Sequence, residues 1–582
     1  MRTPTLQYLY LQKPLVLLLI VTIVSVCWIY AGDFYTKGEP REASVAVSMV
    51  EQNNWILPKV YADEIAYKPP LAHWLMAAFS LPRGSVSVLS ARLPSAIAFV
   101  WLIGACFLFF GRRVKGQKAF LTCMLLITSF ELHRAAMTAR VDMVLTALIV
   151  LGLFCLFRWE DDKKLKGFPI VTVFILSCAI LVKGPVGIVL PLFVFGVYLL
   201  ILKYNFWEIA GKFVLIAFAS MVLPAIWYYL AYKQGGQEFL DLVWAENFGR
   251  FFGGEVNISY SLGHEMPFWF NFVTLATGFI PWTLLLIMSL FVIKYSFKFP
   301  GFKKIWSNML SMSKVKLFSL VAAVLIVFFY CIPISKRSVY LMPAYPFIAV
   351  FIAQYILYLV KNKSKIIRIF SIIIGSIGIL VALIVLLTVV TQLVEPAQLV
   401  GFIKNERILS DIAVIWSALT APNLLYVVLF SILVGFIYIL FNLQRKKNNL
   451  KILYATIATY LAIFAVMDGI FIPAFKSGAS VEPFAKEITS YNSENETIYV
   501  VNDLRQYANM YGVNFYLHNS FRNFEKELPA SGLLLIGEND YKKLFPHYEN
   551  LYDFSLLKQS DGKMSDNRQV TSLYSFYKKD GL

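Results

Sequence analysis

A cluster of two acids and one arginine, Glu39, Arg41 and Glu42, follows the first long apolar run of this 582-residue chain. A carboxylate at such a place could accept a proton or stabilise a developing charge, and an arginine could bind a phosphate through two parallel hydrogen bonds. The alternative is an acidic first turn of a helix, which the helix dipole favours. We predict Glu39 as a catalytic acid, Arg41 as a phosphate ligand and Glu42 as a substrate contact.

A second cluster, Tyr67-Lys68-Pro69-Pro70, holds a lysine in front of two prolines. Proline disfavours helical backbone in the residue before it, so Lys68 is expected to be extended and could direct its ammonium at an anionic headgroup. A lysine that only anchors the chain at a membrane surface fits equally well. We predict Lys68 as a phosphate ligand and Tyr67 as a substrate contact.

Arg140 and Asp142 stand at the start of another apolar run. An aspartate at the edge of a membrane span is costly unless it is paired or functional. Asp142 is therefore predicted as a second catalytic acid and Arg140 as a phosphate ligand, with a simple Arg140–Asp142 ion pair as the alternative. Farther on, Lys183-Gly184-Pro185 interrupts an apolar run and is typical of a tight turn between helices.

Two later segments complete the set of candidate residues. Glu246, Arg250 and His264 are close in sequence and are predicted to contact substrate, although a lone histidine in a loop is usually neither a metal ligand nor a base. In the other segment, Lys336 and Arg337 precede Tyr340. These three residues are predicted to bind a phosphate group.

The elements that must position these residues are membrane-spanning helices. The chain is 58% hydrophobic and 15% charged, whereas soluble domains average about 25% charged residues. A helix needs about 20 apolar residues to cross a bilayer. The apolar runs that we predict as spans are 14–32, 91–110, 118–135, 143–158, 168–183, 185–203, 212–232, 267–293, 316–334, 339–360, 367–391, 423–443 and 452–473. The fold class is therefore an α-helical polytopic membrane protein with about 13 transmembrane helices.

The loops between these runs predict the orientation. Clusters of lysine and arginine recur on one side, which the positive-inside rule makes cytoplasmic. The N-terminus is then cytoplasmic, and the loops 33–90 and 233–266 lie on the opposite side, periplasmic in a bacterium. The formal charge of +18 is distributed over these loops, which argues against a nucleic-acid partner. All the candidate residues above fall on the outer side.

The chain divides into a transmembrane domain, 1–473, and a tail, 474–582, of different character. The segments 497–501, 532–537 and 572–577 are rich in β-branched, aromatic and leucine residues and predict strands, and 481–491 and 503–511 predict helices. A tail of this length suits a small α/β domain. Within the loop 33–90, the segment 41–53 predicts an interfacial helix and 69–81 predicts a second surface helix or a re-entrant segment.

An ordered series of motifs then gives a resemblance. Gly38-Glu-Pro-Arg-Glu, Lys68-Pro-Pro-Leu, Ala91-Arg-Leu-Pro, Arg140-x-Asp142 and Lys183-Gly-Pro follow one another along the chain. The series resembles the bacterial dolichyl-phosphate-mannose-protein mannosyltransferase-like family of C-type glycosyltransferases, and most closely its branch that uses undecaprenyl-phosphate aminoarabinose and modifies lipid A. Gly38 departs from the acidic residue usual in the family, and so does Tyr67.

The resemblance implies an integral membrane glycosyltransferase of the bacterial inner membrane, with a periplasmic α/β domain. It implies an inverting transfer from a polyprenyl (undecaprenyl) phosphate sugar donor to an acceptor that could be lipid A, a surface glycan or a protein. Among the candidate residues, it makes Asp142 the family's acid, Arg41, Lys68 and Tyr340 donor-phosphate contacts, and His264 a neighbour of a possible divalent metal. No other cofactor is expected, and we expect a monomer in contact with membrane lipid.

Two other classes of function stay open on the sequence. A membrane transporter or lipid flippase would need charged residues near the bilayer midplane or repeats with broken helices. A sensor or assembly protein with a periplasmic binding domain is the third class. Release of undecaprenyl phosphate from a sugar donor separates the enzyme from both.

Overall fold

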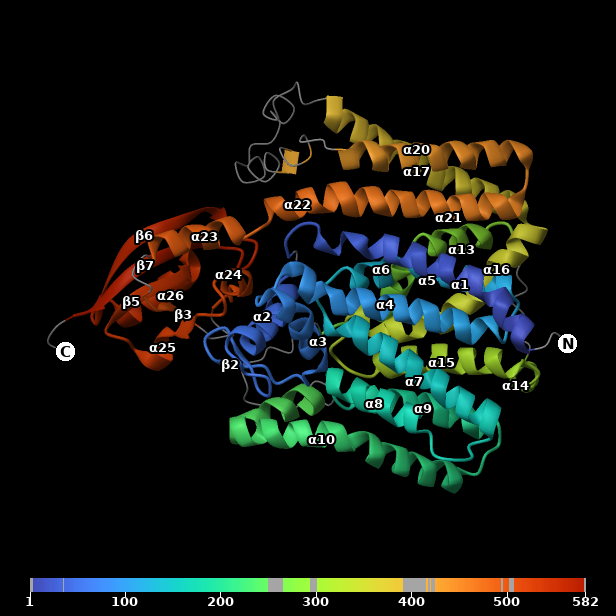
Figure 1. The fold of residues 1–582 in the computed structure, drawn as a ribbon, viewed down its shortest axis with the longest axis horizontal. Helices are drawn as coiled ribbons and strands as arrows, with labels where there is room; N and C mark the ends of the chain where they lie inside the picture. Colours follow the sequence, from blue (N-terminus) through green and yellow to red (C-terminus); the bar gives the residue numbers. More distant parts are fainter. Residues whose placement is uncertain are drawn as a thin grey trace.

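A bundle of long apolar helices and a small domain with a β-sheet make up the chain (Figure 1). The segment that carries α2 and α3 lies where the bundle meets the domain, and we call this the domain end of the bundle (Figure 1). The structure is a computed structural model. It describes residues 4–34, 36–249, 265–293, 301–390, 415–416, 419, 424–492, 496–501 and 507–579.

The helices of the bundle are apolar along most of their length. Their bounds are α1 (Pro4–Val26), α4 (Val88–Gly111), α5 (Gly116–Ile127), α6 (Phe130–Ala136), α7 (Val141–Lys163), α8 (Ile170–Lys183), α9 (Val186–Ile201), α10 (Phe206–Trp244), α12 (Phe270–Gly278), α13 (Trp282–Leu290), α14 (Phe302–Leu310), α15 (Lys314–Cys331), α16 (Tyr345–Asn362), α17 (Ser364–Val390), α20 (Leu424–Lys446) and α21 (Asn449–Val466). In the described part of the chain, nine helical stretches are long and apolar enough to cross a membrane, or eleven if two bent pairs count as one span each. The predicted multi-pass architecture is confirmed, whereas the number of thirteen crossings stays a prediction.

Two of the predicted spans are broken helices. The span predicted at 118–135 is α5 and α6, which meet at 64°, and the span predicted at 267–293 is α12 and α13, which meet at 107°. Pro281, which directly precedes α13, has no backbone N–H to continue a helical hydrogen-bond ladder. A hydropathy pattern contains no information about such a bend, because both halves of each span are equally apolar.

The two breaks contact each other, and this satisfies polar groups that the breaks release. The Phe130 N–H donates to the Ile280 carbonyl at 3.3 Å. The Trp282 indole N–H donates to the Thr128 hydroxyl at 2.9 Å, in a fully buried contact. Irregular backbone within a membrane protein is tolerated where neighbouring segments pair its polar groups. The bends direct α6 and the start of α12 toward the domain end, where the candidate residues gather.

The first loop is folded and largely buried. It contains α2 (Gly38–Glu51), the antiparallel pair β1 (Lys59–Val60) and β2 (Glu64–Ile65), and α3 (Leu71–Ser80). The two helices match the segments predicted at 41–53 and 69–81. Ala43, Ala46 and Met49 of α2 are fully buried, because α2 packs against α3 on one side and against α24 of the C-terminal domain on the other. Burial on both sides fixes the orientation of the polar side chains that α2 carries.

The C-terminal domain is joined to the bundle through α21 and α22 (Ile472–Gly478). Its sheet has the order β4-β3-β5-β7-β6, with β3 parallel to β4 and β5, and β7 antiparallel to β5 and β6. The bounds are α23 (Glu482–Tyr491), β3 (Ile498–Val500), α24 (Tyr511–Tyr516), β4 (Arg522–Asn523), α25 (Phe524–Glu527), β5 (Ser531–Gly537), α26 (Glu538–Tyr548), β6 (Tyr552–Lys563) and β7 (Val570–Lys578).

This domain has the α/β class that the sequence predicts, and the three predicted strands coincide with β3, β5 and β7. The helix predicted at 503–511 has only its end in the described residues, where α24 begins at Tyr511. β6 was not predicted, because its residues Tyr552–Lys563 are mostly polar or exposed and its pairing with β7 alone makes it an edge strand.

Candidate functional site

A cavity of about 560 Å³ opens at the domain end. Seven of its lining residues are lysine or arginine, and one, Glu42, is a carboxylate. We call it the cation cavity. It is lined by Thr36, Lys37, Gly38, Arg41, Glu42, Tyr67, Lys68, Arg134, Arg140, Met266, Phe270, Lys336, Arg337, Ser338, Val339 and Tyr511. This excess of cations over carboxylates among the lining residues makes the cavity suited to an anionic ligand.

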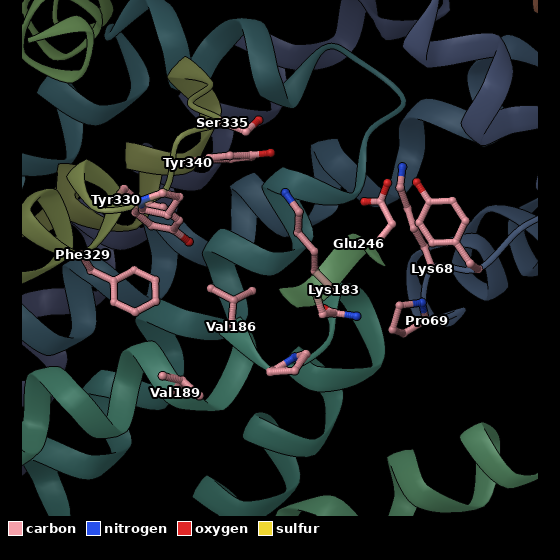
Figure 2. Close-up of a pocket in the computed structure, with 14 residues that line it drawn as sticks. Lys68, Pro69, Lys183, Val186, Val189, Glu246, Phe329, Tyr330, Ser335 and Tyr340 are labelled. Carbon is pink, nitrogen blue, oxygen red and sulfur yellow. The ribbon is translucent and has the colours of Figure 1, made fainter. Parts of the chain in front are cut away.

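A second cavity, of about 320 Å³, adjoins the first and has a mostly apolar wall. Figure 2 shows Val186, Val189 and Phe329 on one side of it, and Lys68 and Glu246 on the other. We call it the apolar groove. Its lining residues are Tyr67, Lys68, Pro69, Lys183, Pro185, Val186, Val189, Glu246, Asn247, Phe329, Tyr330, Pro333, Ser335 and Tyr340. Tyr67 and Lys68 line both cavities, so the groove and the cation cavity meet at these two residues.

Glu42 lies between two nitrogen atoms from the segment that ends in α3. The Lys68 ammonium donates to Glu42 Oε1, and His73 Nε2 lies 2.7 Å from Glu42 Oε2. His73 itself is 1% exposed, so it holds the carboxylate from the buried side while the cavity remains open on the other. Burial raises the pKa of the Glu42 carboxyl, but the Lys68 ammonium and the His73 bond outweigh burial, so its pKa lies well below the usual range. Glu42 is an ionised carboxylate facing a positive cavity.

Arg41, the neighbour of Glu42 on α2, is held by a different acid. Its guanidinium donates to Glu64 Oε1 at 2.5 Å, and the Tyr511 hydroxyl donates to Glu64 Oε2 at 2.6 Å. The side chain of Glu64 is 5% exposed and that of Arg41 is 29% exposed. Arg41 lines the cation cavity, and part of its side chain is still accessible to a ligand.

Asp142 lies behind the groove, where two helix ends meet. It is in the first turn of α7, and Lys183 is the last residue of α8, so each charge has the sign that its helix dipole favours. Lys183 Nζ donates to Asp142 Oδ1 at 2.5 Å and lies 4.3 Å from the centre of the Tyr340 ring. The partner of Asp142 is thus Lys183, whereas the sequence suggested Arg140. Gly184, at φ +74°, ends α8 and makes the predicted tight turn.

Glu39 is on the same helix as Glu42 but does not reach either cavity. Arg92 Nε of α4 donates to Glu39 Oε1 at 2.8 Å, and both side chains are 0% exposed. The Ala139 N–H donates to the same oxygen at 3.1 Å. Burial raises the pKa of Glu39, but Arg92 outweighs it and the net shift is downward. This geometry gives Glu39 no contact with a substrate in either cavity, contrary to our sequence-based assignment.

The remaining predicted phosphate ligands differ in how many hydrogen bonds they already make with the protein. Arg140 and Arg337 line the cation cavity, and neither guanidinium makes a hydrogen bond or ion pair with a residue in the described part of the chain. Lys336 Nζ, in contrast, donates to the carbonyls of Pro333 at 2.6 Å and Met266 at 3.0 Å. An ammonium has three donors, so most of the capacity of Lys336 is used in holding its own loop. Tyr340 lines the groove beside Lys183.

Of the other candidate residues, two line the apolar groove and two lie outside the described part of the chain. Glu246 and Tyr67 both line the apolar groove, as predicted contacts of a substrate would. Arg250 and His264 lie outside the described residues. Among the described ranges, no group of three or more His, Cys, Asp or Glu residues could hold a metal ion. Glu42 and His73 form only a pair, so these residues do not fit a metal centre, and a metal stays a prediction tied to His264.

Three residues in or behind the two cavities were not predicted as part of the site. Lys183 was taken as part of a turn, and Arg134 and His73 carried no assigned role. Arg134 is bonded to Glu131 at 2.7 Å and lines the cation cavity. The missing signal is long-range: Lys183 and Asp142 are 41 positions apart, and only the antiparallel packing of α7 on α8 brings them together.

Known proteins give matches to both the sequence and the fold. Residues 67–229 match the model of the family described as dolichyl-phosphate-mannose-protein mannosyltransferase. An uncharacterized protein of Aquifex aeolicus is 28% identical over 366 residues, which are 60% of this chain and 66% of that protein. The undecaprenyl phosphate-alpha-4-amino-4-deoxy-L-arabinose arabinosyl transferase of Shewanella sediminis is 21% identical over 352 residues, 59% of each protein. The chain thus matches less than two thirds of the length of these relatives.

The crystal structure of ArnT from Cupriavidus metallidurans in the apo state superposes with a TM-score of 0.66 and 17% identity, over 96% of this chain and 97% of that one. The structure of the same protein bound to undecaprenyl phosphate gives 0.65 and 16%, over 97% and 98%. The chain has the ArnT fold. The predicted resemblance to the mannosyltransferase-like family is confirmed, and so is the predicted C-type glycosyltransferase fold with its C-terminal domain. Because the ArnT fold extends over both cavities, the likeness includes the part of this chain where the candidate residues gather.

Proposed function

We propose that this chain is an integral membrane glycosyltransferase that moves a sugar from a polyprenyl-phosphate donor to an acceptor at the membrane surface. The observation that carries the proposal is the junction of the two cavities at Tyr67 and Lys68. An apolar groove suits a prenyl chain, and the cation cavity suits the phosphate at its end. The family match and the names of the arabinosyl transferase relatives support the same activity.

The proposed reaction needs few protein groups. The bond between the anomeric carbon of the sugar and the donor phosphate breaks, and a bond from that carbon to an acceptor oxygen forms. Polyprenyl phosphate leaves as an anion, which Lys68 and Arg41 stabilise electrostatically. If the acceptor is a phosphate, it needs no base; if it is a hydroxyl, its proton passes to Glu42, the carboxylate that lines the cation cavity. Donor phosphate at Lys68 weakens the hold of that ammonium on Glu42, which raises the pKa of the acid toward a useful range.

The charge of the cavity favours an anionic acceptor. Lys68, Arg41 and Arg134 are already paired with Glu42, Glu64 and Glu131. Arg140, Lys336 and Arg337 line the cavity without a carboxylate partner among the described residues, and this is more positive charge than one donor phosphate neutralises. The phosphate groups of a lipid A-type acceptor match that charge better than an uncharged glycan or a protein hydroxyl. A monomer is sufficient to form the proposed site, since a single chain lines both cavities. A transporter or flippase is the less favoured alternative, because the relatives with an assigned activity are transferases.

The proposed site lies in the bacterial inner membrane, at its periplasmic face. This orientation is supported by the clusters of lysine and arginine in the loops of the other side. A reporter enzyme that is active only in the periplasm should be active when fused after Phe475 and silent when fused after Lys447. The reverse pair of results would place the cation cavity in the cytoplasm and contradict the proposed periplasmic chemistry.

The function is tested with purified full-length protein in nanodiscs. The wild type should release undecaprenyl phosphate when it is given an undecaprenyl-phosphate sugar and an anionic lipid acceptor. Lys68→Met should weaken the binding of sugar-free undecaprenyl phosphate by about 1.5–3 kcal/mol, the value of a lost hydrogen bond to a charged group. The measurement is a titration at one salt concentration.

Lys59→Met is the matched control for this titration. Lys59 belongs to the same loop, but its side chain is 55% exposed and its ion-pair partner is Asp63, so its replacement should leave the affinity unchanged. Equal affinities of wild type and Lys68→Met would mean that Lys68 only anchors the chain to ordinary lipid headgroups. A wild type that releases no undecaprenyl phosphate would contradict the transferase itself.

A further inference from the structure

The C-terminal domain contributes a wall to the cation cavity. Tyr511, the first residue of α24, is the lining residue that comes from this domain. It is 8% exposed, and the neighbouring lining residues Arg41 and Glu42 come from α2. The cavity is therefore closed by two segments that are 470 positions apart in the chain.

The domain is docked at this place by a dense set of contacts. The Met510 N–H donates to the Tyr61 hydroxyl at 3.0 Å, and the Tyr61 N–H donates to Asn519 Oδ1 at 3.0 Å. Asn519 Nδ2 donates to the Lys59 carbonyl at 2.8 Å. Tyr61 is 1% exposed and belongs to the hydrophobic core of the C-terminal domain, although it lies in the first loop. Contacts of this kind fix the position of α24 relative to α2.

Tyr511 uses this fixed position to bond Glu64. Its hydroxyl donates to Glu64 Oε2 at 2.6 Å, while Arg41 donates to Glu64 Oε1 at 2.5 Å. The Tyr511 hydroxyl also accepts a hydrogen bond from Asn509 Nδ2 at 3.1 Å. The Arg41 guanidinium carbon lies 5.5 Å from the centre of the Tyr511 ring, within range of a cation–π interaction. Tyr511 thus constrains Arg41 twice, through the carboxylate and through the ring.

We propose that Tyr511 is a positioning residue through which the C-terminal domain holds Arg41, by way of Glu64, in the orientation that binds an anion in the cation cavity. The inference rests on the proposed function only in naming that anion as the lipid phosphate. An arginine has many rotamers, and fixing one of them before the ligand arrives removes an entropic cost from binding. Two oxygens of one carboxylate, each bonded to a different partner, are a direct way to fix it.

Tyr511→Phe in the full chain removes the hydroxyl and keeps the ring. Affinity for sugar-free undecaprenyl phosphate should fall about three- to tenfold. This is at most the effect of losing one hydrogen bond to a charged group. In turnover assays kcat/KM for the donor should fall by at least the same factor, because Arg41 holds the donor phosphate and also stabilises the charge that develops on it as the sugar leaves.

Tyr516→Phe is the matched control. Tyr516 is on the same helix, and its hydroxyl donates to another carboxylate of the first loop, Asp33. Asp33 and Tyr516 line a third cavity, which shares Thr36 and Lys37 with the cation cavity, but neither Asp33 nor Tyr516 lines the cation cavity itself. Loosened docking of the domain would affect both variants alike, whereas loss of Arg41 positioning affects only Tyr511→Phe. The Tyr511→Phe effect should also shrink to about twofold or less in an Arg41→Gln background, since the two residues act as one unit.

Three results would overturn the inference. They are an unchanged affinity in Tyr511→Phe, an equal loss in Tyr511→Phe and Tyr516→Phe, and a full Tyr511→Phe effect that persists without Arg41. Failure of the proposed function is a different result, since a wild type that does not bind undecaprenyl phosphate fails before any variant is compared.

Discussion

Glu42→Gln is expected to lower turnover with a hydroxyl acceptor by about 10²-fold or more, the usual size of the contribution from a positioned acid–base group. Glutamine can still accept a hydrogen bond from Lys68 through its carbonyl, and its amide can donate to His73 Nε2 in the imidazole tautomer that carries its proton on Nδ1. What is lost is the negative charge and the ability to accept a proton. The chemical step should therefore suffer while the local structure is kept.

The binding of the donor phosphate should move in the opposite direction. In the free protein Lys68 forms an ion pair with Glu42. Removing the negative charge of Glu42 therefore makes the cation cavity more attractive to an anion. Glu42→Gln should thus bind sugar-free undecaprenyl phosphate at least as tightly as the wild type does. A drop in turnover together with unchanged or tighter donor binding separates a role in the reaction from a role in holding Lys68.

A control for this variant is available on the same helix. Glu51 is also bonded to a histidine, His518 Nδ1 at 2.8 Å, but that histidine belongs to the C-terminal domain and neither residue lines the cation cavity. Glu51→Gln should retain wild-type turnover. If Glu42→Gln also turns over at the wild-type rate, Glu42 is a structural partner of Lys68 and the reaction depends on no carboxylate in this cavity.

Local sequence rules were sufficient for some of the candidate site. Lys68 was predicted as a site residue because two prolines constrain the backbone before them, and Asp142 because a carboxylate at the edge of an apolar run is costly. The resemblance supplied the order of the motifs along the chain. These arguments use only neighbours in sequence or a known pattern, and the multi-pass fold follows from composition in the same way.

The sequence could not give the pairing of charges. Glu39 and Glu42 are three positions apart on α2, and nothing local decides which of them meets Arg92 and which meets Lys68. The choice depends on how α2 is rotated between α4, α3 and α24, which is a property of packing. The bonds of Lys336 to backbone carbonyls and the approach of Tyr511 from the C-terminal domain depend on tertiary structure in the same way.

Glu39→Gln should lower stability and leave the chemistry nearly intact. Arg92 is fully buried, and among the described residues its guanidinium donates, besides Glu39, only to backbone carbonyls such as those of Gly32 and Asp33. Breaking a buried ion pair by removing one charge costs about 3–5 kcal/mol, because the other charge stays buried without compensation. The expected result is a marked fall in the thermal unfolding temperature of the full chain in detergent. Turnover per folded molecule should stay within a few-fold of the wild type.

The double variant Glu39→Gln with Arg92→Met tests whether the charge pair is the cause. Its loss of stability should be smaller than the sum of the two single losses, since it leaves no unpaired buried charge. The acid side of the stability profile gives an independent measurement. The pKa of Glu39 is lower in the folded chain than its ordinary value of 4.5, so the stability it contributes is complete at neutral pH. That contribution is lost as the pH falls below the ordinary pKa of Glu39 and through its lower pKa in the folded chain.

Glu39→Gln should accordingly lose less stability on acidification than the wild type does. An unchanged stability together with a large loss of turnover would instead support the catalytic role that the sequence suggested for Glu39. In that case Glu39→Gln would unfold at the wild-type temperature and lose about 10²-fold in turnover. A carboxylate sealed against Arg92 and the Ala139 N–H has no path to a substrate in either cavity. The unfolding temperature and the turnover of this one variant therefore distinguish a structural ion pair from a catalytic acid.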